Sequence, residues 1–92
     1  MYHIEGYNAD LIGHTSPETA ERYLLEHGFE LAGETQTYKS FVRFDKAEGD
    51  AVVVVPKLKE YADYIIRMDE TIKKVSEATG LTIQEILRGM IT

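Results

Sequence analysis

A cation, an aromatic ring and a second cation alternate at Lys39, Phe41 and Arg43, within a stretch of aromatic and β-branched residues. Side chains alternate between the two faces of a strand, so these three are expected to share one face. An aromatic ring that stacks on a base, beside cations that bind phosphates, is typical of RNA recognition. RNA binding is therefore one candidate function, with the candidate residues Tyr38, Lys39, Phe41, Arg43, Lys57 and Lys59.

The opposite face of this strand has the composition of a core face. Its predicted members are Tyr38, Ser40, Val42 and Phe44. On this interpretation the face that carries the two cations is solvated, and its aromatic residue packs under another segment. Both interpretations place the helices of the domain against the same side of the strand.

The residue types that most often do chemistry are scattered along the chain. None of the histidines, His3, His14 and His27, has a metal-ligand partner three or four residues away, and no glycine-rich phosphate loop is present. The chain has no cysteine, which excludes disulfides and thiolate metal sites and agrees with a reducing cytoplasm. We therefore predict no catalytic residue, no metal site and no cofactor, and we expect a protein that is not an enzyme.

The net charge of −6 is concentrated in the first third of the 92-residue chain. Residues 1–34 contain seven acids and one base, whereas residues 35–92 contain nine of each. An acidic surface repels phosphate backbones and attracts basic partners. The distribution favours a basic partner protein over a nucleic acid, although solubility alone also explains it.

Residues 56–79 are predicted to form one long helix. Their apolar positions recur at steps of three and four, which places on one helical face Leu58, Tyr61, Ile65, Met68, Ile72 and Val75. This face can pack on the sheet, pair in a two-stranded coiled coil, or pack on the sheet while its flank contacts a partner. Large residues off the apolar face favour the third arrangement, with the partner-binding residues Tyr61, Tyr64, Ile66 and Arg67.

The other segments complete an α+β domain of the order α-β-β-β-α-α. Ser16 and Pro17 begin a helix that ends at Gly28, and three strands are expected at 29–33, 37–44 and 51–55. The unbroken valines of the third strand predict burial on both faces or a central position. A last short helix is expected at 83–88. We predict a three-stranded antiparallel sheet packed on one side by helices, in a single domain at 15–92 with a C-terminal helical hairpin.

The first fourteen residues lack a clear period and are predicted to be an irregular N-terminal arm docked on the domain or on a partner. They contain acids and lack the basic start of a secretory signal. No apolar run approaches the roughly 20 residues that span a bilayer. We therefore expect a cytoplasmic protein with no membrane partner.

The segment from Ser16 to Val55 resembles the small bacterial HicA-type toxins, which are mRNA interferases with a double-stranded-RNA-binding-domain-like α-β-β-β-α fold. The resemblance lies in the His27–Leu31 stretch, in the second strand, and in the Val54-Val55-Pro56 end of the third strand. In that family a Gly-Ser-His opens the second strand and its histidine is catalytic. Here the stretch reads Gln36-Thr37-Tyr38, so the resemblance implies the fold without the catalytic histidine. The segment from Val55 to Met68 is similar to small bacterial proteins of no assigned function.

These features lead to a main hypothesis and two alternatives. The main hypothesis is a non-enzymatic protein-interaction domain with a HicA-like core. It binds a second copy of itself or a basic partner protein, in a toxin–antitoxin or related regulatory context. One alternative is an RNA-binding module that uses the second strand. The other is a residual nuclease in which Tyr38 or His27 replaces the missing histidine.

Overall fold

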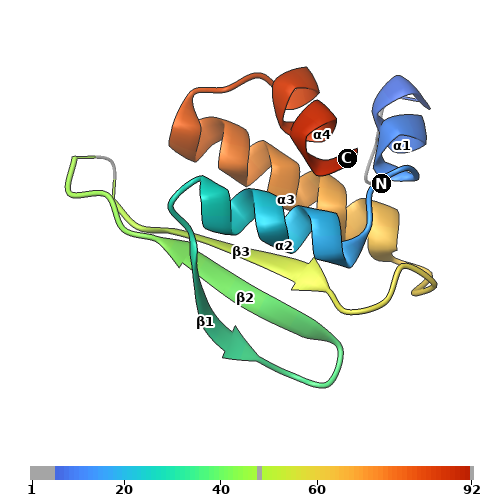
Figure 1. Cartoon of the computed structure of the whole chain (residues 1–92), viewed down its shortest axis with the longest axis horizontal. Coiled ribbons are helices and arrows are strands. Elements are labelled where there is room, and N and C mark those ends of the chain that lie inside the picture. Colours follow the sequence, from blue (N-terminus) through green and yellow to red (C-terminus); the bar gives the residue numbers. More distant parts are fainter. Residues whose placement is uncertain (1–5, 48, 92) are drawn as a thin grey trace.

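The computed structural model describes residues 6–47 and 49–91, which form a three-stranded sheet and four helices. In chain order the elements are α1 (Gly6–Ile12), α2 (Pro17–Glu26), β1 (Glu30–Glu34), β2 (Tyr38–Arg43), β3 (Ala51–Pro56), α3 (Tyr64–Thr79) and α4 (Ile83–Ile91). The sheet is antiparallel with the strand order β1-β2-β3, and the helices form a layer beside it (Figure 1). The predicted α+β fold class is confirmed.

The segment predicted to be an irregular arm contains an additional helix. Residues 6–12 form α1, and Ile12 at its end is fully buried in the core. Gly6 and Gly13 at the two ends of this segment favoured irregular structure, but a seven-residue helix depends on tertiary packing, which the local sequence does not show. Tyr2 and Ile4, two of the apolar residues of the expected arm, lie outside the described residues.

Helix α2 begins and ends where the sequence predicts. The Ser16 hydroxyl accepts a hydrogen bond from the Thr19 amide (3.2 Å), and the Thr19 hydroxyl accepts one from the Ser16 amide (3.0 Å). Two amides that have no partner within the helix are satisfied in this way, and Pro17 at the first position needs none. Gly28 follows the helix with a φ of 88°, a conformation that glycine adopts without steric cost.

Helix α3 starts at Tyr64, several residues later than the apolar spacing predicts. Residues 57–63 instead form hydrogen-bonded turns, in which the Tyr61 amide donates to Leu58 and the Tyr64 amide donates to Tyr61. The chain must reverse direction after β3, and these turns provide the reversal. Leu58 is consequently exposed, and Ile65 in the first turn of α3 is 38% exposed, so the prediction that they share a buried face is wrong. The later members of the predicted face, Met68, Ile72 and Val75, are buried in the core.

The sheet presents to the helices the face that was predicted to be solvated. Phe41 is fully buried among helix and strand residues, while Phe44 and Tyr38 are exposed on the other side. The expected core face of β2 is therefore wrong. Both faces carry an aromatic residue, so the alternation identifies two faces but not the one that the helices cover.

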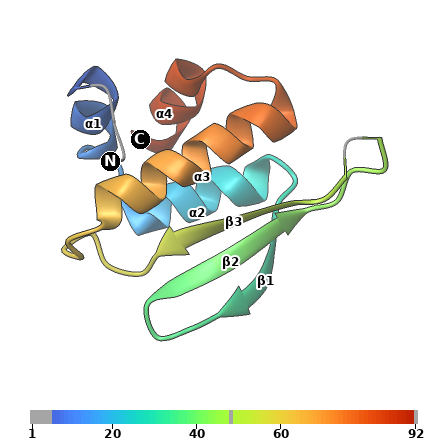
Figure 2. The same cartoon turned by 180° about the vertical axis from the view of Figure 1, so that it is seen from behind.

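Strand β3 lies at an edge of the sheet and its Val52 is 52% exposed, so both the expected central position and the expected burial on both faces are wrong. Helix α3 runs along its free edge, as both views of the ribbon show (Figures 1 and 2). The Thr71 hydroxyl on α3 donates a hydrogen bond to the main-chain carbonyl of Val54. The helix thus covers an edge that would otherwise expose unpaired backbone groups, which explains why the strand is as apolar as a central one.

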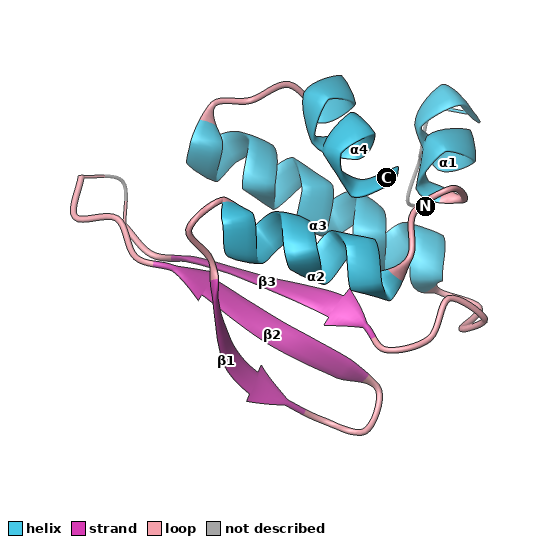
Figure 3. Ribbon diagram, in the orientation of Figure 1, coloured by secondary structure: helices cyan, strands magenta, loops and turns pink. Residues whose placement is uncertain are grey.

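The core lies between the inner face of the sheet and the helices. Its fully buried members come from every element except β1, which pairs with β2 alone and whose side chains are mostly exposed. Figure 3 shows the resulting arrangement, with the helical layer on one side, β3 next to it, and β2 and β1 projecting away. None of the described helices combines the length and the apolar character that crossing a bilayer requires.

Candidate functional site

The sheet leaves one broad face without a covering element, and we call it the outer face. The register of the strands places side by side on this face Tyr38 with Pro56, Ser40 with Val54, and Val42 with Val52. Phe44 continues the alternation beyond the end of β2 and is 67% exposed, while Val52 is 52% and Tyr38 41% exposed. The outer face is thus an uncovered apolar surface rimmed by polar residues.

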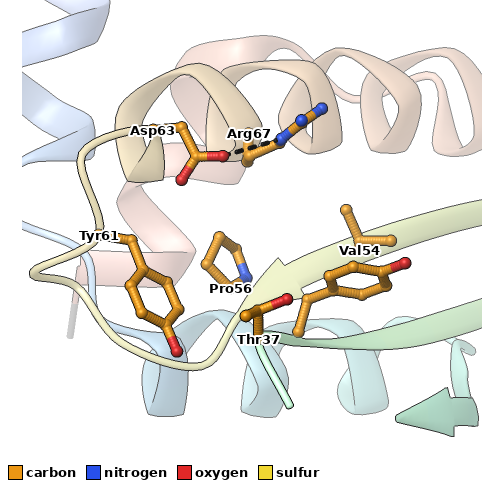
Figure 4. Close-up of a pocket in the computed structure, with 7 residues that line it drawn as sticks. Thr37, Val54, Pro56, Tyr61, Asp63 and Arg67 are labelled. Atoms are coloured by element: carbon orange, nitrogen blue, oxygen red, sulfur yellow. Dashed lines mark hydrogen bonds and ion pairs between the residues drawn. The ribbon is translucent and has the colours of Figure 1, made fainter. Parts of the chain in front are cut away.

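A hollow of about 310 Å³ lies at the Tyr38 end of the outer face (Figure 4). Its walls come from the β1–β2 turn, the end of β3, the turns at 57–63 and the start of α3. The lining residues are Thr37, Tyr38, Val54, Pro56, Tyr61, Asp63 and Arg67. Arg67 Nε lies 3.2 Å from an Asp63 carboxylate oxygen, so its charge is partly neutralised at the rim. The hollow is mostly apolar inside and suits an apolar side chain better than a charged ligand.

A second hollow of about 530 Å³ lies at the other end of β3. It is lined by the start of the strand and by the last turns of α3, at Gly49, Asp50, Ala51, Val52, Lys74, Glu77 and Ala78. Each hollow therefore joins outer-face residues of β3 to residues of α3. The exposed side of α3 and the outer face of the sheet form one continuous surface.

The exposed side of α3 carries a row of alternating charges, which we call the α3 flank. It consists of Arg67, Glu70, Lys74 and Glu77, whose spacing of three, four and three places them along one side of the helix. Arg67 also lies 3.7 Å from Glu70 within this row. The flank is a polar margin for the apolar outer face, which is the usual layout of a protein interface.

Three of the four predicted partner-binding residues lie at the surface, and the fourth, Tyr64, is buried. Tyr61 and Arg67 meet at the first hollow, and Ile66 is 40% exposed on the outside of α3. Tyr64 is only 2% exposed, and its hydroxyl is hydrogen-bonded to the Thr15 hydroxyl at 2.8 Å. Burial also raises the pKa of Tyr64 above its ordinary value. The expectation that Tyr64 is exposed is wrong because α1 and Thr15, which follows it, cover this end of α3.

The cations of the predicted RNA-binding strand face inward and are engaged by the fold. Lys39 lies 3.2 Å from Glu21 on α2, and Arg43 donates to the main-chain carbonyl of Ala78 at 2.6 Å. Lys57, which follows β3, lies 2.6 Å from Glu34 and lowers the pKa of that carboxyl. Of the other candidate residues, Phe41 is buried, Tyr38 lies on the outer face and Lys59 is exposed. The structure does not bring the six residues together.

The histidines that the structure describes are separate from one another. His27 Nδ1 donates a hydrogen bond to the Tyr23 carbonyl (2.8 Å), and the His27 ring stacks on the Tyr23 ring at a centroid distance of 3.9 Å. His14 is exposed next to α1, and His3 lies outside the described residues. Within residues 6–47 and 49–91, no three acidic or histidine side chains gather as a metal site would require.

Sequence reasoning missed Phe44 and Val52 as surface residues because the alternation assigns Phe44 to the core face of its strand and Val52 lies within an unbroken apolar run. In the structure the cations of the opposite face are matched by acids, because Lys39 pairs with Glu21 on α2 and Arg43 lies near Asp45. Such a match is not recognisable before the fold is known. Comparisons of the chain with protein-family models, with curated proteins and with solved structures found no match.

Proposed function

We propose that this protein is a non-enzymatic protein-interaction domain with a HicA-like core, and that its binding surface is the outer face with the α3 flank. The observation that carries the proposal is the uncovered apolar outer face, whose most exposed member, Phe44, is 67% exposed. Apolar patches of this kind, rimmed by polar residues, mark sites of association. The order α2-β1-β2-β3-α3 is also the order that the HicA resemblance implies.

The position of the missing catalytic histidine supports a binding function over an enzymatic one. In this chain the position is Tyr38, which lies at the border of the first hollow. A tyrosine hydroxyl has too high a pKa to replace an imidazole in proton transfer near neutral pH. An aromatic ring with a polar tip is in contrast a favoured contact residue at protein interfaces.

RNA binding is the weaker candidate on three grounds. The ring that was expected to stack on bases is Phe41, which is buried. Lys39, Arg43 and Lys57 each have an acidic or carbonyl partner within the fold. The net charge of −6 also opposes the approach of a phosphate backbone.

Site-specific photo-crosslinking tests the proposed function. The photoreactive amino acid p-benzoylphenylalanine is introduced at position 44, on the outer face, or at position 25 as the control. Leu25 is 52% exposed on α2 and lies on a different side of the molecule. Irradiation of cells that express the variants should give a discrete protein adduct from position 44 and none from position 25. A variant that reacts with water alone at position 44 would rule out the outer face as an interaction surface.

A further inference from the structure

We propose that the partner of the outer face is a second copy of this chain, packed face to face with its strands antiparallel to those of the first. This proposal rests on the proposed function and identifies the partner. The two-fold axis lies parallel to the sheet and perpendicular to its strands. It places β3 over β3 and α3 beside α3 of the two copies.

The charges of the α3 flank are complementary to themselves when the helix is reversed. The row reads positive, negative, positive, negative at Arg67, Glu70, Lys74 and Glu77. Position 72 lies midway between Arg67 and Glu77, and also midway between Glu70 and Lys74. Two antiparallel copies of α3 therefore place each cation of one copy beside an anion of the other. A parallel arrangement, in contrast, would place like charges together.

The midpoint of the outer face along the strands lies beside the midpoint of the α3 flank, position 72. Tyr38 and Phe44, its two exposed aromatic residues, are equally far from Phe41, which is paired with Val53 in the neighbouring strand. The hydrogen bond from Thr71 to the Val54 carbonyl fixes the α3 centre beside this point. One two-fold axis can therefore satisfy both the charged flank and the apolar face. Nothing in the folding of a single chain requires the two centres to coincide.

The spacing of the two layers also matches. Sheets that pack face to face lie about 10 Å apart, and packed helices lie about 8–10 Å apart. Because α3 runs along the free edge of β3, the two-fold axis that stacks the two sheets also brings the two α3 helices to the same edge of the dimer. Sheet and helix contacts can therefore form together. Glu30, which pairs with Val42, lies on β1 at the far margin of the face, where the rim of the interface would be.

The same arrangement gives the first hollow an occupant. Reversal of β2 places Phe44 of the second copy opposite Tyr38, at the border of the hollow lined by Val54 and Pro56. Phe44 is the most exposed of the large apolar side chains described in the chain. An aromatic ring that enters an apolar hollow on its partner is the typical hot spot of an interface. Each copy contributes one such ring and one such hollow.

The size of the surface predicts a dimer of moderate strength. Strands of five or six residues, at about 3.3 Å each and about 4.8 Å apart, give a face of roughly 20 by 14 Å. The α3 flank adds a strip about 10 Å wide. This is below the area of tight obligate dimers, so we expect a dissociation constant of roughly micromolar size.

The mass of the full-length protein in solution provides the first test. Sedimentation equilibrium should show concentration-dependent conversion to twice the 10.5 kDa mass of the chain. Phe44→Ser should weaken the dimer at least roughly 30-fold, because the hot spot is lost twice. Leu25→Ser is the matched control and should leave it unchanged. A protein that stays monomeric at about 500 µM, well above the expected constant, would overturn the proposal. A dimer insensitive to Phe44→Ser would overturn it too.

A charge exchange between two variants tests the antiparallel register. In Glu77→Lys the symmetric dimer has Arg67 beside a cation, and in Arg67→Glu it has Glu77 beside an anion. Each variant alone should dimerise roughly tenfold more weakly than the original protein. A mixture of the two should form a heterodimer, because every contact between positions 67 and 77 then joins opposite charges. Thermal unfolding of each variant confirms that the fold is intact. If the mixture associates no better than either variant, the proposed register is wrong.

The crosslinking experiment distinguishes this proposal from the proposed function. An adduct at position 44 with the mass of two chains supports both. An adduct with a different protein would keep the proposed function and overturn the second copy as partner. The absence of any adduct would remove the proposed function, and the dimer with it.

Discussion

Replacement of Gly89 by alanine has two opposite effects on stability. It raises helix propensity, and it creates a steric clash with Tyr23. Gly89 lies inside α4, where alanine is normally better than glycine by about 1 kcal/mol because it restricts the unfolded chain. A β-carbon built at this position, however, would lie 2.3 Å from Cε2 and 2.5 Å from Cδ2 of Tyr23. These distances are far below van der Waals contact. Either α4 or the Tyr23 ring must move.

The Tyr23 ring has little freedom to move. It is 5% exposed and stacks on the His27 ring at 3.9 Å on α2. Overpacking of this kind costs about 1–3 kcal/mol, and the contact here is at the severe end. After the gain in helix propensity is subtracted, we expect Gly89→Ala to destabilise the protein by about 1–2 kcal/mol. In a domain of this size that lowers the melting temperature by roughly 5–15 °C.

A double-mutant cycle isolates the steric part of this cost. Urea unfolding is measured for the original protein, Gly89→Ala, Tyr23→Val and the double variant. Valine has no ring, so in its presence the alanine methyl group has room and should be neutral or stabilising. The coupling between the two substitutions should then favour the double variant by about 1–3 kcal/mol. A stabilising Gly89→Ala in the presence of Tyr23 would refute the argument that α4 packs directly on this ring.

Two further predictions follow from hydrogen bonds that join distant segments. Arg43→Met removes a donor 2.6 Å from the Ala78 carbonyl at the end of α3, and should lower the free energy of unfolding by about 1–2 kcal/mol in urea titration; an unchanged midpoint would show that this bond contributes nothing. Burial raises the pKa of Tyr64 above 10.0, so the folded state resists ionisation that the unfolded chain undergoes. The contribution of Tyr64 to the free energy of unfolding is therefore complete at pH values below the pKa of an exposed tyrosine, and it is lost as the pH rises above that pKa. Tyr64→Phe should reduce the loss of stability between about pH 8 and about pH 11, whereas an equal loss in both proteins would contradict this assignment.

The sequence determined every described element except α1, and several of the boundaries. Ser16 and Pro17 begin α2, Gly80 ends α3 with a φ of 76°, and Gly49 provides the positive φ of the β2–β3 turn. These are local effects: a cap, a fixed ring or a left-handed conformation acts within a few residues of its own position. The fold class follows from the order of such elements, which is why it could be predicted.

Tertiary structure alone decided which surfaces are covered. The two faces of β2 have similar apolar content, and the choice between Phe41 and Phe44 depends on the side to which α2 and α3 return. Tyr64 is buried because the distant residue Thr15 meets its hydroxyl. Strand β3 is an edge whose valines are explained by a helix beside it. Alternation in a strand specifies two faces but not their surroundings, because those are set by contacts between residues far apart in sequence.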